Sequence, residues 1–217
     1  MDIAVLGTGS VGRTLARGLA GVGHTVVVGT RDPAQTRRRE DWLAADDITL
    51  DTFAEAAAGG EVIVNATNGA ASLSVLGDAG VDNLAGKVIL DVANPLDFSQ
   101  GFPPTLSVKD TDSLAEQIQR AFPEARVVKS LNTVNCALMV DPARVPGEHQ
   151  IFVSGEDDGA KEQVTALLGE FGWPARRVID LGGIRTARAV EMYLPLWLAL
   201  FQSTGTSEFN VEVRRAR

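Results

Sequence analysis

The sequence predicts an α/β fold with a doubly wound, mostly parallel sheet and a small C-terminal helical portion. Short runs rich in valine and isoleucine alternate with longer segments of helical spacing, which implies right-handed crossovers between parallel strands. Most of these runs are almost continuously apolar, as strands are when helices cover both faces of a sheet. The first run also leads directly into a glycine-rich turn that opens a helical segment. Together these patterns favour one large sheet between two helical layers.

The expected elements follow one another regularly along the chain. We expect strands at residues 2–6, 25–29, 61–66, 87–92, 126–130 and 150–154. We expect helices at residues 11–22, 51–58, 111–122, 159–171 and 185–203. Glycine and proline mark two long loops, at residues 94–104 and 142–147. The second loop predicts a boundary between an N-terminal domain of residues 1–146 and a smaller C-terminal α/β portion of residues 147–217, although both could pack as one body.

Composition excludes several classes of protein. The chain of 217 residues is 45% hydrophobic and 22% charged, which is typical of a globular protein. A single cysteine, Cys136, excludes an internal disulfide framework and a multi-cysteine metal site, so we expect no metal. The net charge of −8 argues against nucleic acid as a partner. The densest apolar stretch, residues 192–201, is too short to cross a bilayer and the N-terminus lacks a signal-peptide pattern. We therefore expect a cytoplasmic protein without a membrane partner.

The first strand is followed by a motif that predicts a phosphate site. The run Gly7-Thr8-Gly9-Ser10-Val11-Gly12 matches G-x-G-x-x-G at every glycine, between an apolar strand and a helix. The first glycine would permit the tight turn, the second would let the backbone approach a pyrophosphate, and the third would let the helix sit close to the sheet. Free amides at the start of the helix would face the anion. The motif predicts a Rossmann-type dinucleotide site, and the alternative is a glycine turn without a ligand.

The end of the second strand indicates which dinucleotide is used. An acidic residue usually holds the ribose 2′-hydroxyl of NAD at this place, but here the residues are Thr30 and Arg31. A hydroxyl and a guanidinium suit a 2′-phosphate, so we expect NADP(H). Asp32 could instead hold the hydroxyl of NAD, but we expect it to cap the helix that follows. Arg37 or Arg38 would add a second cation near the phosphate.

Polar residues follow three of the later strands. In an open α/β sheet, ligands lie outside the carboxyl ends of the strands. Asparagines at these ends would offer uncharged donors and acceptors to a carboxamide, a ribose and a planar heterocycle, whereas the alternative is that Asn and Thr simply favour turns. As a group we favour ligand contact, with cofactor residues Thr67, Asn68 and Asn94 and acceptor residues Asn132, Thr133 and Asn135.

Acid–base groups are sparse near these strand ends. Tyr193 lies in the apolar last helix, so a tyrosine–lysine dehydrogenase pair is not supported, and Lys129 is the one lysine near the expected cleft. Cys136 is either a reactive thiol or, more often for such a residue, a packed one. We therefore name no catalytic residue. Reduction of a carbonyl normally needs a positioned proton donor, whereas hydride transfer between two redox cofactors chiefly needs orientation and exclusion of water.

The chain also resembles a known family along its whole length. The similar segments are residues 7–12, 26–31, 127–133, 155–158 and 180–182, together with Asn68, Pro95 and Glu191. They resemble the NADP-dependent deazaflavin oxidoreductases, which pass hydride between NADPH and coenzyme F420. The resemblance implies that residues 7–12 bind NADP. It also implies that the strand ends around Asn68, Pro95 and Asn132 flank the nicotinamide and the acceptor.

The sequence departs from this family in two places. Members of the family have a histidine at the position of Asn132, and residues 91–95 are closer to the cytoplasmic reductase domains of membrane ferric reductases. The expectation of NADP(H) does not depend on these positions. We expect an NADPH-dependent oxidoreductase that moves hydride to a deazaflavin or flavin-like acceptor. The alternatives are a reductase of a small imine or carbonyl compound and a non-catalytic module that senses NADP.

The last expected helix is too apolar for a lone surface helix. It carries Val190, Leu194, Trp197 and Phe201 at helical spacing, with more apolar residues between them. We expect this helix to be buried partly within the fold and partly against a second copy, which makes a homodimer. The alternative is complete burial within one chain.

Overall fold

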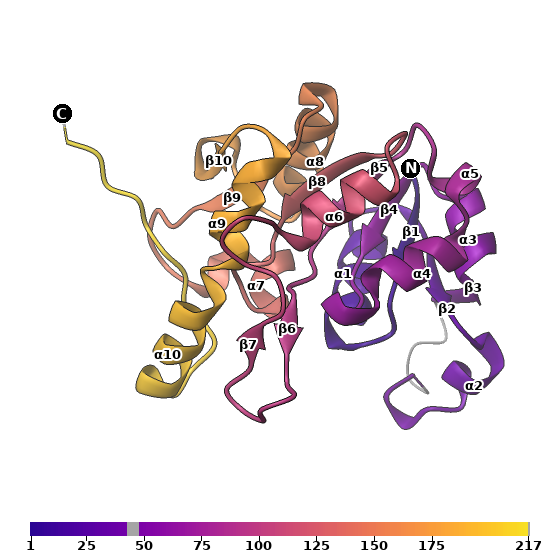
Figure 1. Ribbon diagram of the computed structural model, residues 1–217, viewed down its shortest axis with the longest axis horizontal. Helices are drawn as coiled ribbons and strands as arrows, with labels where there is room; N and C mark the ends of the chain where they lie inside the picture. Colours follow the sequence, from indigo (N-terminus) through magenta and orange to yellow (C-terminus); the bar gives the residue numbers. More distant parts are fainter. Residues whose placement is uncertain (43–47, 217) are drawn as a thin grey trace.

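The computed structural model describes residues 1–42 and 48–216 (Figure 1). An eight-stranded sheet runs through it in the order β10-β9-β8-β5-β4-β1-β2-β3. The strands are β1 (Asp2–Leu6), β2 (Thr25–Thr30), β3 (Thr49–Thr52), β4 (Val62–Asn65), β5 (Val88–Asp91), β8 (Arg126–Ser130), β9 (Ile151–Ser154) and β10 (Val178–Asp180). A small antiparallel hairpin is formed by β6 (Leu96–Asp97) and β7 (Thr105–Leu106).

The strand order is that of a Rossmann-type fold and confirms the expected fold class. Six strands, from β3 across to β8, pair in parallel, and β9 then pairs antiparallel with β8. The chain builds outward from β1 in one direction through β2 and β3, and in the other through β4, β5 and β8. The order therefore reverses between β1 and β4, which is the place where a doubly wound sheet opens a crevice for a ligand.

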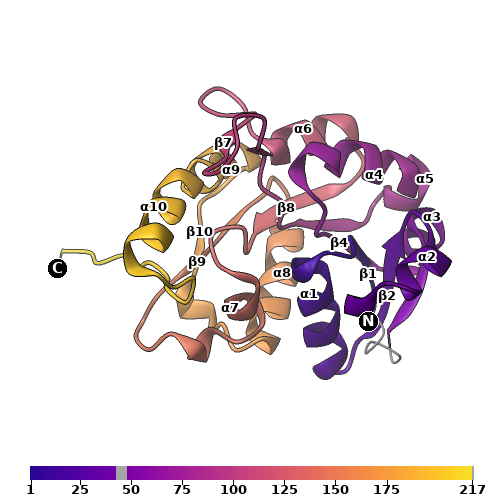
Figure 2. The same ribbon diagram turned by 90° about the horizontal axis from the view of Figure 1, so that it is seen from below.

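Helices cover both faces of the sheet (Figure 2). One layer contains α1 (Ser10–Gly21), α7 (Cys136–Val140) and α8 (Asp158–Glu170). The other contains α3 (Phe53–Gly59), α4 (Ser72–Ala79), α5 (Val81–Leu84) and α6 (Leu114–Ala121). In β1, Ile3 and Val5 face the first layer whereas Ala4 and Leu6 face the second, and all four are buried. A strand buried on both sides explains the continuous apolar runs of the sequence.

Several element boundaries differ from the sequence-based expectation. The expected helix at residues 51–58 begins later, because Thr52 ends β3 and its hydroxyl caps α3 by accepting from the Glu55 amide at 3.2 Å. Strands β3 and β10 and helix α4 were not expected, since their segments are short or lack a strong apolar period. The last expected helix is two helices, α9 (Ala187–Glu191) and α10 (Leu194–Thr204), and Pro195 stands in the first turn of α10.

The small α2 (Pro33–Arg37) follows β2, and its N-cap is Asp32, whose carboxylate accepts from the Gln35 amide at 2.8 Å. The capping role expected for Asp32 is thus confirmed. The expected boundary at residue 146 falls between β8 and β9, which pair in the same sheet, so the division into two units stays a prediction. None of the helices in the described part of the chain is long and apolar enough to cross a membrane.

Candidate active site

A long cleft lies along the carboxyl ends of the strands. It consists of two cavities, of about 460 and 480 Å³, that share Ala66, Thr67 and Asn68 as common lining. The first cavity lies over the ends of β1 and β2, and the second lies over the ends of β4, β5 and β8. The shared residues follow β4, next to the point where the strand order reverses. The cleft is therefore where the fold predicts a ligand.

The glycine-rich turn forms the floor between β1 and α1. Gly7 has a φ of +124°, and a Cβ there would lie 2.4 Å from the Ala66 carbonyl oxygen. A Cβ on Gly12 would lie 2.0 Å from the Gly7 carbonyl oxygen, so both positions require glycine for packing. A Cβ on Gly9 would instead meet nothing within 4 Å, because this glycine faces the open cavity. These are the separate roles that the motif predicts.

The start of α1 suits an anion. Its N-cap is Gly9, which supplies no side-chain cap, and the first turn carries no acidic residue. The first amides of a helix lack partners within the helix and stand at the positive end of its dipole. Ser10 and Val11 line the second cavity, so this helix start lies between the two halves of the cleft. The residues present therefore fit a dinucleotide pyrophosphate.

Two guanidinium groups reach the first cavity. Arg31 is exposed and lines this cavity. Thr30 also lines the cavity, and its hydroxyl forms a hydrogen bond with the Thr36 hydroxyl at 2.8 Å. The second cation is Arg39, which donates to the Thr8 hydroxyl at 2.8 Å. Arg37 does not line the cavity and donates instead to the Ile48 carbonyl at 2.7 Å. Arg39 lines the cavity and its guanidinium is also paired with the Asp41 carboxylate at 2.8 Å. The phosphate contact expected of Arg37 stays a prediction.

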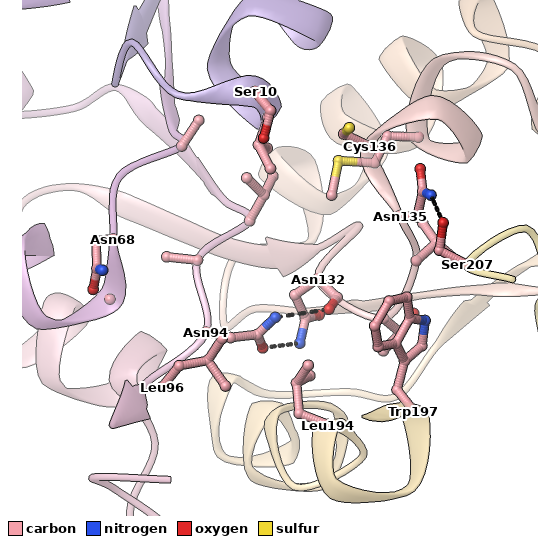
Figure 3. A pocket seen from close by; sticks show the side chains of 18 of the residues that line it. Ser10, Asn68, Asn94, Leu96, Asn132, Asn135, Cys136, Leu194, Trp197 and Ser207 are labelled. Atoms are coloured by element: carbon pink, nitrogen blue, oxygen red, sulfur yellow. Dashed lines mark hydrogen bonds between the residues drawn. The ribbon is translucent and has the colours of Figure 1, made fainter. Parts of the chain in front are cut away.

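The second cavity is lined by asparagines whose amides pair with one another (Figure 3). Asn94 donates to the Asn132 carbonyl at 2.8 Å, and Asn132 returns a hydrogen bond to the Asn94 side-chain oxygen at 2.9 Å. The second N–H of the Asn132 amide goes to the Val190 carbonyl at 3.1 Å. Leu131, just before Asn132, has a φ of +62°, a strained value for a branched residue. This backbone turn directs Asn132 toward Asn94 and α9.

The other expected residues have mixed surroundings. Asn135 lines the cavity, but both ends of its side-chain amide are used within the protein. The amide oxygen caps α7 by accepting from the Ala137 N–H, and the amide nitrogen donates to the Ser207 hydroxyl at 2.5 Å. Thr67 lines both cavities and donates to the side-chain oxygen of Asn65 at 2.7 Å. Pro95 is buried and does not line the cavity, and its carbonyl accepts from the Ser107 amide at 2.8 Å. Asn68 is exposed between the two cavities.

Two polar atoms beside the second cavity have no partner among the described residues. The Thr133 hydroxyl is buried and unpaired, and so is the indole nitrogen of Trp197. A buried polar group without a hydrogen bond costs free energy, so each of these atoms lacks a partner that a ligand or a water would supply. Trp197 also stacks on Phe201 and Phe209 at centroid distances of 5.7 and 5.3 Å, so this wall is rich in aromatic rings. The cavity therefore fits a planar ring that carries polar edges.

Sequence reasoning missed the wall that α10 contributes. Leu194, Trp197 and Phe201 line the cavity opposite the strand ends. Their helical spacing was visible in the sequence but indicated only burial or a dimer surface. Gly69 was also missed, where a Cβ would lie 2.1 Å from the Asn94 carbonyl oxygen. Among the described residues, no cluster of histidine, cysteine or acidic side chains could hold a metal ion.

The chain matches known proteins over different parts of its length. Residues 2–95 match the family of coenzyme F420-dependent NADP oxidoreductases. The crystal structure of a candidate F420-dependent NADP reductase from Arthrobacter sp. FB24 is 55% identical, with a TM-score of 0.95, and the match covers 99% of this chain and 100% of that one. The F420-dependent NADP reductase of Methanothermobacter marburgensis is 28% identical over 92% of each chain.

A third relative belongs to a much longer protein. Metalloreductase STEAP3 of Rattus norvegicus is 32% identical over 90% of this chain, but the match spans only 37% of the metalloreductase. The fold and the cleft, with these relatives, define an NADP-dependent oxidoreductase of the Rossmann class. More narrowly, the chain belongs to the family of coenzyme F420-dependent NADP oxidoreductases, whose members use NADP(H) and coenzyme F420.

Proposed function

We propose that this protein transfers hydride between NADP(H) and a deazaflavin or flavin-like acceptor. The observation that carries the proposal is that the two cavities of the cleft border one another. They share Ala66, Thr67 and Asn68, so a nucleotide in one half would reach an acceptor in the other. Relatives named as F420-dependent NADP reductases support a deazaflavin as the first acceptor to test.

In this proposal the first half of the cleft holds the nucleotide. The backbone from Gly7 to Gly12 binds the pyrophosphate, with Gly9 leaving the space that the phosphates fill. Arg31 and Thr30 hold the 2′-phosphate, and Arg39 is a further guanidinium in the cavity wall, whose charge Asp41 offsets. The nicotinamide then lies near Thr67, Asn68 and Asn94, at the start of the second half.

The second half of the cleft orients the acceptor. NADPH would give up a hydride and become NADP+, and the planar ring would take up that hydride together with one proton from solvent. The protein's task is then to place the two rings against each other. The paired amides of Asn94 and Asn132 fix the two strand ends. The Thr133 hydroxyl and the Trp197 N–H remain to hold polar edges of the ring. No acid–base residue is needed in this arrangement.

Turnover of NADPH with different acceptors tests this function. The purified protein is mixed with NADPH and with coenzyme F420, a flavin, or a small imine or carbonyl compound, while NADPH absorbance is followed. We expect turnover with the deazaflavin or a flavin. Turnover with only the imine or carbonyl compound would replace the proposal with the small-molecule reductase. Tight NADPH binding without turnover of any acceptor would favour an NADP sensor.

We also propose that the protein is a cytoplasmic homodimer. Leu196 on α10 is 55% exposed, and Phe98 and Phe102 of the neighbouring β6–β7 hairpin are 52% and 62% exposed. Leu96 and Phe98 line the second cavity together with residues of α10, so the hairpin and α10 border the same cavity. A second copy would cover them and close the acceptor site from outside. Sedimentation that shows only monomer at micromolar concentration would contradict the dimer.

A further inference from the structure

Beneath the floor of the second cavity lies a fully buried group of three charges. The ammonium of Lys129 lies 2.8 Å from a carboxylate oxygen of Asp91 and 2.8 Å from one of Glu191. It also donates to the Ala93 carbonyl at 2.5 Å. The three side chains are at most 1% exposed. Burying charges this completely is costly, so the arrangement must be held by further hydrogen bonds.

The remaining carboxylate oxygens are satisfied by the protein itself. Asp91 accepts from the side-chain amide of Asn65 at 2.8 Å. Glu191 accepts from the amides of Leu114 and Ala115 at 2.8 and 3.1 Å, and these amides open α6. Two carboxylates and one ammonium leave one negative charge in excess, and the positive end of the α6 dipole offsets it. Burial opposes the charged form of Lys129, but the two carboxylates outweigh it and raise its pKa, so the ammonium stays protonated.

These three residues come from the two sides of the acceptor cavity. Asp91 ends β5, three residues before Asn94, and Lys129 stands in β8, three residues before Asn132. Glu191 instead ends α9, and α10 with its wall residues Leu194 and Trp197 follows two residues later. The ion group therefore joins the strand ends to the helix pair that forms the opposite wall.

We propose that Glu191, through Lys129 and Asp91, is a positioning residue that sets the distance between the α10 wall and the strand ends of the cleft. The inference rests on the proposed function, because that wall is assigned to the acceptor ring. Hydride transfer is sensitive to geometry, and a displacement of about 1 Å by a distant change can cost about 100-fold in rate. Glu191 lines neither cavity, so it acts only through the elements that it holds.

The chain offers a matched control on the same pair of helices. Arg188 of α9 donates to the Glu116 carboxylate of α6 at 2.6 and 2.8 Å, which is an ion pair between the same elements without a link to the strand ends. Glu191→Gln removes one charge of the buried group, and Glu116→Gln removes one charge of the control pair. Both substitutions keep the size of the side chain.

The experiment compares both variants with the wild type in three measurements. These are NADPH affinity by calorimetry, kcat and KM with coenzyme F420, and amide hydrogen exchange in α10. For Glu191→Gln we expect NADPH affinity within about twofold, kcat lower by about 100-fold, and exchange in α10 faster by at least about tenfold. For Glu116→Gln all three should stay within about threefold of the wild type.

Two results for this pair of variants would overturn the inference. One is an equal response of Glu191→Gln and Glu116→Gln in kcat and in α10 exchange. The other is a parallel loss of NADPH affinity and kcat in Glu191→Gln, which would mean a general loss of structure. If Glu191→Gln does not fold, Met192→Gly replaces it, because this change loosens the link between α9 and α10 and leaves the ion group intact. We expect the same fall in kcat and the same faster exchange in α10. A Met192→Gly variant with the kcat and exchange of the wild type would overturn the inference. Failure of the proposed function would look different. The wild type would then not turn over NADPH with coenzyme F420, whereas exchange in α10 would still show whether the ion group holds this helix.

Discussion

The two halves of the cleft are built in different ways. The nucleotide half is lined only by residues of the first third of the chain, from Gly7 to Asn68, and the glycine-rich turn supplies its backbone floor. The acceptor half is lined by the segments that follow β4, β5 and β8 and by α10, and its residues run from Ser10 to Ser207. The nucleotide half is therefore drawn from one part of the chain, whereas the acceptor half is assembled by the whole fold.

This difference predicts how each half responds to change. A site made of backbone depends on missing side chains, so it is damaged by adding atoms and not by removing them. A site made of side chains depends on their hydrogen bonds, so it is damaged by removing single polar atoms. In the nucleotide half, Gly9 is a backbone position that added atoms would damage, and Arg31 is a side chain whose removal would damage the site.

The largest effect is expected from filling the space at Gly9. A Cβ there meets no atom within 4 Å, so Gly9→Leu should lower the free energy of unfolding only by the loss of a glycine N-cap, about 1 kcal/mol. The added side chain would occupy the place of the pyrophosphate and should weaken NADPH binding by at least about 100-fold, or roughly 2.8 kcal/mol. Calorimetric titration and urea unfolding measure the two quantities. Gly21→Leu, at the far end of α1 and equally open, is the control and should bind normally.

Removing the guanidinium of Arg31 should have the next largest effect. Hydrogen bonds to charged groups contribute roughly 1.5–3 kcal/mol, so Arg31→Ala should weaken NADPH binding about 10- to 100-fold. NADH lacks the 2′-phosphate, and its affinity should change by no more than about threefold. Arg38→Ala is the matched control, since Arg38 is exposed but does not line the cavity. Equal losses for both nucleotides would show that Arg31 acts through folding.

The acceptor half should respond to a single hydroxyl. Thr133→Val replaces an unpaired buried hydroxyl by a methyl group of the same size. Without ligand the variant should be as stable as the wild type or more so, because an unsatisfied polar atom is removed. With coenzyme F420 as acceptor, KM should rise about 3- to 10-fold, which corresponds to about 0.5–1.5 kcal/mol for one neutral hydrogen bond. An unchanged KM in steady-state kinetics would remove Thr133 from the acceptor site.

The smallest effect is expected at the start of α6, beneath the acceptor half. Hydrogen bonds from Arg120 lower the pKa of Asp112 from 3.8 to about 2. The folded form therefore resists protonation more than the unfolded chain does. The stability from this pair should be present above about pH 4 and lost as the pH falls toward 2.

The pair is partly open to solvent, with Asp112 28% and Arg120 60% exposed, so its worth should be about 0.5–1 kcal/mol. Asp112→Asn should lower the free energy of unfolding by this amount at pH 6. The same variant should match the wild type near pH 2. Urea unfolding at the two pH values makes the comparison, and an equal difference at both would mean that the carboxylate charge is not responsible.

The fold class could be predicted from the sequence because it depends on local patterns. Apolar runs such as residues 2–6 identify strands buried on both faces, and the glycine-rich turn identifies the first crossover. The N-cap role of Asp32 follows from its place before Pro33. The break between α9 and α10 could not be read in the same way, because the apolar pattern of residues 185–203 continues through it.

By itself, the sequence determined the Rossmann-type fold, the glycine-rich turn from Gly7 to Gly12 and the basic residue Arg31 at the end of the second strand. Each of these depends on residues that are neighbours in the chain. Only the tertiary structure decided that Arg39 and not Arg37 lines the first cavity, that Asn94 pairs with Asn132, and that α10 forms the opposite wall. Lys129, Asp91 and Glu191 likewise meet only in the folded chain, because a contact between distant segments depends on how helices and strands pack and leaves no periodic mark in the sequence.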